Sequence, residues 1–211
     1  KAVAESSKVL AIRGRVIPST LEKVTLLGEF MDGTIVEGET NITAAQKPLR
    51  NIGLKPDNVR ACPEALDAIE SADLIILGPG SLYTSILPNL LIKDISEAIL
   101  KSDAYKVYIL NVMTQPGETD HLSAWDHQRI LMEHTDPRII EACFANVEPI
   151  PPEMIEKYQE KGALPVVMDL ERIREKGYEV IEGEILRIDG QIRHDSERLA
   201  DVILETLIKY R

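Results

Sequence analysis

A short apolar run followed at once by a glycine–proline turn most constrains what this chain can fold into. The run Leu-Ile-Ile-Leu at 74–77 has no polar alternation, which is typical of a strand buried on both faces of a parallel sheet. The glycines of the turn let the backbone approach a ligand closely, and the proline between them stiffens it. N–H groups and hydroxyls at the carboxyl end of such a strand favour an anion, so we predict a phosphate site there. Its candidate residues are Gly78, Pro79, Gly80, Ser81 and Thr84.

The alternative for this segment is a plain turn between a strand and a helix, because glycine and proline are common turn formers. The segment matches neither the GxGxxG dinucleotide fingerprint nor the phosphate-binding loop GxxxxGK[ST]. Spacing alone therefore leaves both interpretations open.

The net charge of the chain limits the kinds of ligand and partner that it can bind. With 24 Lys and Arg against 35 Asp and Glu, the formal net charge of −11 disfavours nucleic acid and anionic membranes, which clustered basic residues bind. A small phosphorylated ligand remains compatible, since backbone N–H groups and one arginine can hold it locally. No apolar run approaches the roughly 20 residues that span a bilayer, and no signal peptide opens the sequence. We expect a cytoplasmic protein without membrane insertion, with Cys62 and Cys143 as reduced thiols.

The first part of the chain combines helical and antiparallel signals. The sequence begins at Lys1 in what reads as the middle of a helix, predicted over 1–12. Two β-type runs at 24–38 flank Asp32-Gly33, a dipeptide that suits a type I′ hairpin. Residues 39–61 are expected to be loop with one short strand near 51–54, and a helix is expected over 63–71.

After residue 60 the pattern alternates between strands and helices. We predict strands at 74–77, 105–111, 139–147, 165–168 and within 178–188, and helices at 92–101, 121–134, 151–160, 170–176 and 196–210. Asp195 is expected to cap the last helix. This alternation predicts a single α/β domain over 1–211 with a mostly parallel sheet, to which 15–54 adds a hairpin-containing subregion.

A second polar loop, 111–120, follows the strand predicted at 105–111. If this strand neighbours the strand at 74–77, both loops leave the same edge of the sheet. Asn111, Thr114 and Gln115 are then candidates to hydrogen-bond a base, sugar or carboxylate, with turn formation and helix capping as the alternative. Glu118 and Asp120 offer oxygen ligands for a divalent cation, although acidic residues are also favoured near the start of a helix.

Two further side chains are candidates, and the histidines are not. Arg193 lies in a predicted loop before the last helix, where it can fork onto a phosphate or pair with Asp195. Tyr158 lies on an amphipathic helix and suits core packing or stacking on a base. The histidines at 121, 127 and 134 are spaced by six and seven residues rather than four, so we expect solvent-exposed helix residues and propose no metal ligands.

Two long motifs carry a family resemblance. The segments Gly78-Pro-Gly-Ser-Leu-Tyr-Thr-Ser-Ile-Leu-Pro-Asn-Leu-Leu91 and Asn111-Val-Met-Thr-Gln-Pro-Gly-Glu-Thr-Asp120 closely resemble the bacterial gluconeogenesis factor family. The resemblance extends to the Arg13-Gly14-Arg15 region, the hairpin and Arg193-His194, and so covers essentially the whole chain. It implies a Rossmann-like fold similar to 2-phospho-L-lactate transferase of coenzyme F420 biosynthesis. It also implies a nucleotide sugar such as UDP-N-acetylglucosamine as ligand, support of cell shape during gluconeogenic growth, and roles in binding for Tyr158 and Arg193.

One departure from the family pattern qualifies these expectations. The family opens with a Gly-Gly-Gly-Thr-Gly loop and an acidic Asp-Asp-Gly-Gly segment, and this chain has neither, so it looks like the last two-thirds of such a protein. We expect weak or no catalysis by these 211 residues alone. The interpretations are a nucleotide-sugar-binding regulatory protein, a phospholactate-type transferase with possible Mg²⁺, or a scaffold that reports ligand occupancy to a partner. A homo-oligomer is compatible with each of them.

Overall fold

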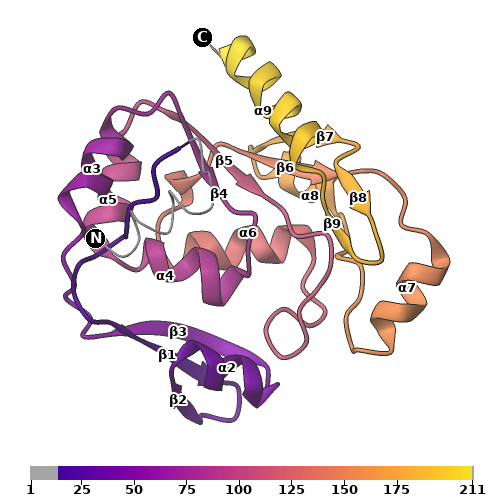
Figure 1. Ribbon diagram of the computed structural model, residues 1–211, viewed down its shortest axis with the longest axis horizontal. Coiled ribbons are helices and arrows are strands. Elements are labelled where there is room, and N and C mark those ends of the chain that lie inside the picture. Colours follow the sequence, from indigo (N-terminus) through magenta and orange to yellow (C-terminus); the bar gives the residue numbers. More distant parts are fainter. Residues whose placement is uncertain (1–13, 211) are drawn as a thin grey trace.

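The chain folds around a parallel four-stranded sheet with the strand order β4-β5-β6-β7, seen in the computed structural model of Figure 1. The structure describes residues 14–210, so the helix expected over 1–12 lies outside the described residues. The strands of this sheet are β4 (Leu74–Leu77), β5 (Tyr105–Ile109), β6 (Ala142–Asn146) and β7 (Glu179–Gly183). Every neighbouring pair is parallel, which confirms the α/β class.

Helices cover both faces of this sheet. The helices of the sheet domain are α3 (Pro63–Glu70), α4 (Leu87–Leu90), α5 (Lys93–Lys101), α6 (Ala124–Glu133), α7 (Pro152–Gln159), α8 (Leu170–Glu175) and α9 (Ser196–Tyr210), with a π-helical turn η1 (Leu82–Ile86) and a 3-10 turn η2 (Pro137–Ile139). Along β5, Val107 and Ile109 face the α9 side, where Leu199 is buried. Tyr108 and Leu110 face the opposite side, among the residues of α4, α5 and α6. Period-two alternation thus divides one apolar strand between two cores.

Strand β4 is less buried than its sequence predicts. Leu77 is buried, but Leu74, Ile75 and Ile76 are half-buried. Within the described residues β4 forms the edge of the sheet and pairs with β5 alone, so one side of the strand lacks a neighbour to cover it. The parallel pairing was predicted correctly, and complete burial on both faces was not.

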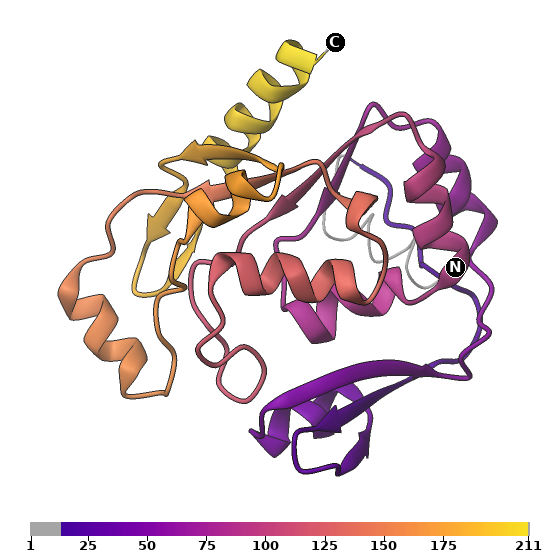
Figure 2. The same ribbon diagram turned by 180° about the vertical axis from the view of Figure 1, so that it is seen from behind.

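An antiparallel unit, which we call the β1–β3 unit, packs beneath the sheet domain (Figure 2). It contains β1 (Thr25–Phe30), β2 (Ile35–Glu37), α2 (Glu39–Ala45) and β3 (Leu49–Lys55), with the strand order β2-β1-β3. The hairpin is confirmed, but the type I′ turn is wrong, since Gly33 is its residue with positive φ and Gly33 N–H donates to Phe30 C=O at 2.9 Å. Helix α2 was missed because its Thr- and Asn-rich sequence has weak helix propensity.

The last third of the chain contains three differences from expectation. No regular strand forms at 165–168, where Pro165 makes an isolated bridge to Met113. The predicted strand region 178–188 divides into β7 and β8 (Leu186–Ile188), and β8 pairs with β9 (Ile192–His194), which the sequence analysis treated as loop. The cap on α9 is confirmed, because the Asp195 carboxylate accepts the N–H groups of Glu197 and Arg198.

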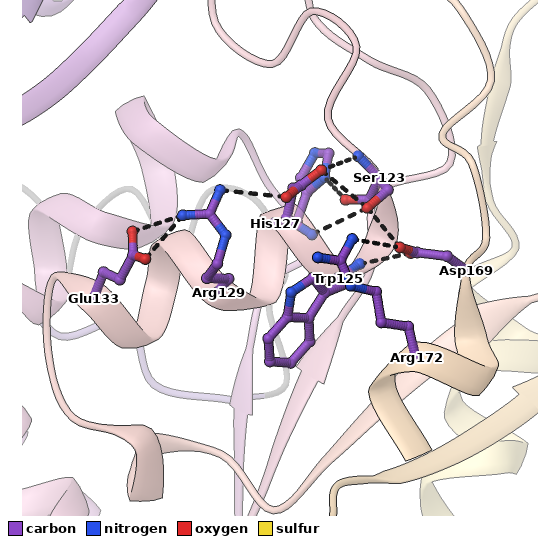
Figure 3. A network of polar contacts seen from close by, with 8 residues as sticks. Ser123, Trp125, His127, Arg129, Glu133, Asp169 and Arg172 are labelled. Atoms are coloured by element: carbon purple, nitrogen blue, oxygen red, sulfur yellow. Dashed lines mark hydrogen bonds and ion pairs between the residues drawn. The ribbon is translucent and has the colours of Figure 1, made fainter. Parts of the chain in front are cut away.

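Helix α6 begins three residues later than predicted because Ser123 caps it (Figure 3). The Ser123 hydroxyl accepts the N–H of Asp126 at 3.2 Å, and the Asp126 carboxylate accepts the N–H of Ser123. Asp169 extends this network, since it accepts the Ser123 hydroxyl at 2.8 Å and the N–H of Trp125 at 2.9 Å. The cap therefore joins the start of α6 to the segment that precedes α8.

One of the histidines, His127, contacts the Ser123 cap. His127 is fully buried, its Nδ1 lies 2.8 Å from Ser123 C=O, and burial lowers its pKa. The expectation that His127 is solvent-exposed was wrong, because this face of α6 packs on the sheet. In residues 14–210, no helix combines the length and apolar composition needed to cross a membrane.

Gly117 offers a test of the contact between the β1–β3 unit and the sheet domain. It has φ +82°, and an added Cβ would stand 2.6 Å from the Cα of Gln46, at the end of α2. Gly117→Ala is expected to lower the free energy of unfolding by about 3 kcal/mol, from strain and from the clash together. Urea unfolding measures this loss.

Gly177→Ala is the matched control. Gly177 has φ +89° and nothing within 4 Å of its added Cβ, so this substitution introduces backbone strain without a clash. It is expected to cost about 1 kcal/mol. An equal loss of unfolding free energy in the two variants would show that the structure around Gln46 accommodates the added methyl group without cost.

Candidate ligand-binding site

A hollow of about 420 Å³ opens at the carboxyl ends of β4 and β5 and collects most of the predicted site residues. Four separate segments contribute to its wall. The predicted residues that line it are Pro79, Gly80, Ser81, Asn111, Gln115, Tyr158 and Arg193. The parallel pairing of β4 and β5 explains this convergence, since it directs both following loops to one edge.

The turn 78–81 has the geometry that its glycines indicated. Gly78 has φ +95°, and a Cβ there would lie 3.4 Å from the carbonyl oxygen of Ile109 on the neighbouring strand. The N–H groups of Gly80 and Ser81 have no acceptor within the described part of the chain. They are available to an anion in the hollow.

Gln115 ties the two loops together. Its Nε2 donates to Ser81 Oγ at 2.8 Å, and its backbone N–H donates to Thr119 Oγ1 at 2.8 Å. The position of the 78–81 turn therefore depends on the conformation of the 111–120 loop.

Three predicted residues do not line the hollow: Gly78, which belongs to the turn beside it, Thr84 and Thr114. Thr114 is buried, and its Oγ1 accepts the N–H of Leu164 at 2.9 Å while its own N–H donates to Leu164 C=O at 2.7 Å. Thr84 lies instead on the wall of a different hollow, between η1 and the β1–β3 unit, and its hydroxyl points to Glu118. Thr114 anchors the neighbouring segment and Thr84 faces the β1–β3 unit.

Arg193 lies on strand β9, directly opposite Arg187, and not in the loop that the sequence indicated. Its Nε donates to the Gln191 amide oxygen at 3.1 Å. Arg187 pairs with Asp189, and Arg198 pairs with Glu148, each at 3.2 Å. Among the arginines of residues 14–210, Arg193 is the one that forms no ion pair with a carboxylate.

Tyr158 supports the strand that carries Arg193. Its hydroxyl accepts the N–H of Ile192 at 2.9 Å, and its ring packs against a cluster that contains Val112, Met154 and Ile192. Tyr158 therefore packs in an apolar cluster and also lines the hollow.

His194 lines the hollow and was missed as a site residue. Its Nε2 lies 3.2 Å from Leu110 C=O, and burial lowers its pKa, so the ring is neutral near pH 7. The alternation Ile192-Arg193-His194 after Gly190 was the signal that this segment is a strand, with residues 192 and 194 facing inward.

The acidic residues of the loop do not converge on a cation. Asp120 accepts the N–H of Gly117 at 2.6 Å, whereas Glu118 is buried beside Thr43 and Thr84. In the described part of the chain no three His, Cys, Asp or Glu residues are grouped as metal ligands would be. The residues present do not fit Mg²⁺, and no chemical step is assigned to it.

A buried cysteine and a second hollow are not candidates for a reactive centre. Cys143 is fully buried, and burial raises the pKa of its thiol to about 12, so it is no nucleophile near pH 7. A larger hollow of about 990 Å³ lies at the opposite, amino ends of β4 and β5, beside Asp73 and Tyr105. It contains none of the predicted site residues.

Comparison with known proteins identifies the family. The family model for 2-phospho-L-lactate transferase CofD matches residues 1–186. The chain is also 44% identical over 207 residues to the gluconeogenesis factor of Bacillus subtilis strain 168, which covers 98% of this chain and 65% of that protein. This chain belongs to the CofD-like gluconeogenesis factor family.

Further members agree in sequence and fold. The gluconeogenesis factor of Halalkalibacterium halodurans is 42% identical over 206 residues, covering 97% of this chain and 64% of the relative. A crystal structure of a UPF0052 family protein from Bacillus halodurans matches with a TM-score of 0.90 at 42% identity, over 95% of this chain and 65% of that one. The chain thus spans slightly less than two-thirds of the length of these gluconeogenesis factor relatives.

The Tyr158 hydroxyl can be tested separately from its ring. Tyr158→Phe leaves the buried N–H of Ile192 without its acceptor, so the free energy of unfolding is expected to fall by about 1–2 kcal/mol. Urea unfolding measures the change. The control is Tyr178→Phe, which removes a hydroxyl that donates to Pro137 C=O near the surface and is expected to cost less than about 0.5 kcal/mol. No loss in Tyr158→Phe would contradict the supporting role of this hydroxyl.

Proposed function

We propose that this chain is a regulatory protein of the cytoplasm that binds a nucleotide sugar of the UDP-N-acetylglucosamine type. The observation that carries the proposal is the hollow itself, which combines backbone N–H groups that have no acceptor among residues 14–210 with an arginine that pairs with no carboxylate in that range. Membership of the gluconeogenesis factor family supports a role in cell shape and in growth on gluconeogenic carbon sources.

The chemistry of the hollow suits a diphosphate joined to polar rings. The N–H groups of Gly80 and Ser81 and the guanidinium of Arg193 would bind the diphosphate. The Asn111 amide would hydrogen-bond the sugar or the base, and the Tyr158 ring offers an apolar surface. These donors act locally, so the net charge of −11 does not prevent binding of an anion.

A phosphoryl-group transferase is the second candidate because the matching family model is described as 2-phospho-L-lactate transferase. Such a reaction would move a phosphorylated carboxylate from a nucleotide to an acceptor alcohol. The relatives that are 44% and 42% identical are described as gluconeogenesis factors, so we favour the nucleotide-sugar-binding protein over the transferase.

Calorimetric titration with UDP-N-acetylglucosamine tests the proposal. We expect micromolar affinity for the unmodified protein. Arg193→Ala is expected to weaken binding by about 30-fold, because a hydrogen bond between charged groups contributes roughly 2 kcal/mol. Arg187→Ala is the control: it removes the same charge from the facing position on β8, where Asp189 already engages the arginine, and should change affinity less than about threefold.

Three results would change the assignment. Absence of binding to uridine nucleotides together with binding of guanosine nucleotides and Mg²⁺ would favour the transferase. Equal weakening of binding by both arginine substitutions would show a general electrostatic effect and not a contact between Arg193 and the ligand. Unchanged affinity in Arg193→Ala would support the ligand but show that Arg193 does not contact it.

A further inference from the structure

Glu118 is a buried carboxyl group at the junction of the ligand-binding loop and the β1–β3 unit. Its side chain is enclosed, with 6% of the residue exposed. Hydroxyl groups reach it from two sides: Thr43 of α2 lies 3.4 Å from Oε1, and Thr84 of η1 lies 3.4 Å from Oε2. One side chain therefore touches the β1–β3 unit and the helix that follows the 78–81 turn.

The junction around Glu118 is tightly packed. The neighbouring Gly117 lies so close to Gln46 that an added Cβ would stand 2.6 Å from its Cα and 2.8 Å from its carbonyl carbon. The β1–β3 unit and the loop thus meet backbone against backbone. A movement of Glu118 must therefore displace both the β1–β3 unit and the loop.

Glu118 is also connected to the hollow. Its backbone N–H donates to Gln115 C=O at 3.0 Å, and the Gln115 side chain donates to Ser81. Ser81 precedes η1, and Thr84 lies within it. Residues 115 and 118 of one loop therefore hold residues 81 and 84 of the facing segment.

The surroundings of Glu118 favour the uncharged acid. It forms no ion pair with any residue in the range 14–210, and the ionisable groups that act on it are Glu39 from α2 and Tyr83 from η1. Burial raises the pKa of Glu118 and Glu39 adds to the rise, while the two threonine hydroxyls oppose it. Ionisation of Glu118 places a second negative charge near Glu39.

We infer that Glu118 is a positioning residue: its buried carboxyl group, between the hydroxyls of Thr43 and Thr84, holds the β1–β3 unit and the Gln115–Ser81 contact together, and a negative charge on it loosens the anion-binding hollow. This inference rests on the proposed function for the identity of the ligand. The positioning role itself concerns contacts that exist without ligand.

The ligand experiment is a titration with UDP-N-acetylglucosamine between about pH 4.5 and pH 8, in the protein and in Glu118→Gln and Glu118→Ala. A diphosphate diester keeps its charge over this range. Affinity of the unmodified protein is expected to fall as pH rises through the raised pKa of Glu118. Glu118→Gln, which keeps the neutral shape, should retain only the pH dependence that the His194 ring of the hollow contributes, so its affinity should fall less with rising pH than that of the unmodified protein. Glu118→Ala should bind about tenfold more weakly than Glu118→Gln throughout.

Glu97→Gln is the control. Glu97 lies on the exposed side of α5 with Lys93 and Lys101, far from the loop, and its substitution should leave the pH profile unchanged. A profile in Glu118→Gln that matches the unmodified protein would overturn the inference.

A second measurement needs no ligand. Because the pKa of Glu118 is raised from its ordinary value of 4.5, its contribution to folding is complete below that value and is lost as pH rises through the raised pKa. Protection factors, which correct amide hydrogen exchange for its intrinsic rise with pH, should fall with pH in α2 and in the 111–120 loop of the protein, and not in Glu118→Gln. If no variant binds the nucleotide sugar, the proposed function fails, while the exchange data still decide the positioning role: exchange that is the same in the protein and Glu118→Gln would overturn it.

Discussion

Burial of β5 on both faces is the constraint on which the rest of this structure depends. From Val107 to Leu110 each residue is at most 1% exposed. A strand that is apolar on both sides requires cover from two layers, and removing its side chains from water stabilises the fold by roughly 25 cal/mol for each Å² buried. Neighbouring parallel strands then fix where polar residues can leave the sheet. The carboxyl ends of β4 and β5 lie together, so the 78–81 turn and the 111–120 loop must meet.

Polar residues of that loop serve its own structure first. Thr114 satisfies the backbone of Leu164, Gln115 holds Ser81, and Glu118 fills the junction with the β1–β3 unit. A loop folded against other segments must pair its buried backbone groups, and nearby side chains supply the partners. The residues left to a ligand are those at the edge of this network, such as Asn111 and the N–H groups of the turn. The hollow is therefore shaped by contacts that never touch its contents.

The features predicted correctly from the sequence are those that depend on residues close together in the chain. Apolar runs located β4, β5 and β6, and Asp195 correctly marked the start of α9, because burial and capping depend on nearby residues. The missed features depend on distant partners. Ser123 begins α6 late because Asp169, 46 residues further on, completes its cap, and His127 is buried by the sheet it packs on. Strand β9 exists because β8 pairs with it, and a three-residue run gives little signal alone.

The same distinction explains why Arg193 and Thr84, both candidates by sequence, separate in the structure. Thr84 follows the turn by three residues, yet the helical path of η1 directs its hydroxyl toward Glu118. Arg193 is 112 residues from Ser81, and the pairing of β9 with β8 brings it to the same hollow.

Its partner there is a neutral amide oxygen of Gln191. Transfer of a guanidinium from an amide to a phosphate replaces a neutral acceptor by a charged one, whereas Arg187 and Arg198 would first have to leave carboxylates. The chain has 35 acidic residues, and an arginine that pairs with none of those within residues 14–210 is the feature that most favours an anionic ligand.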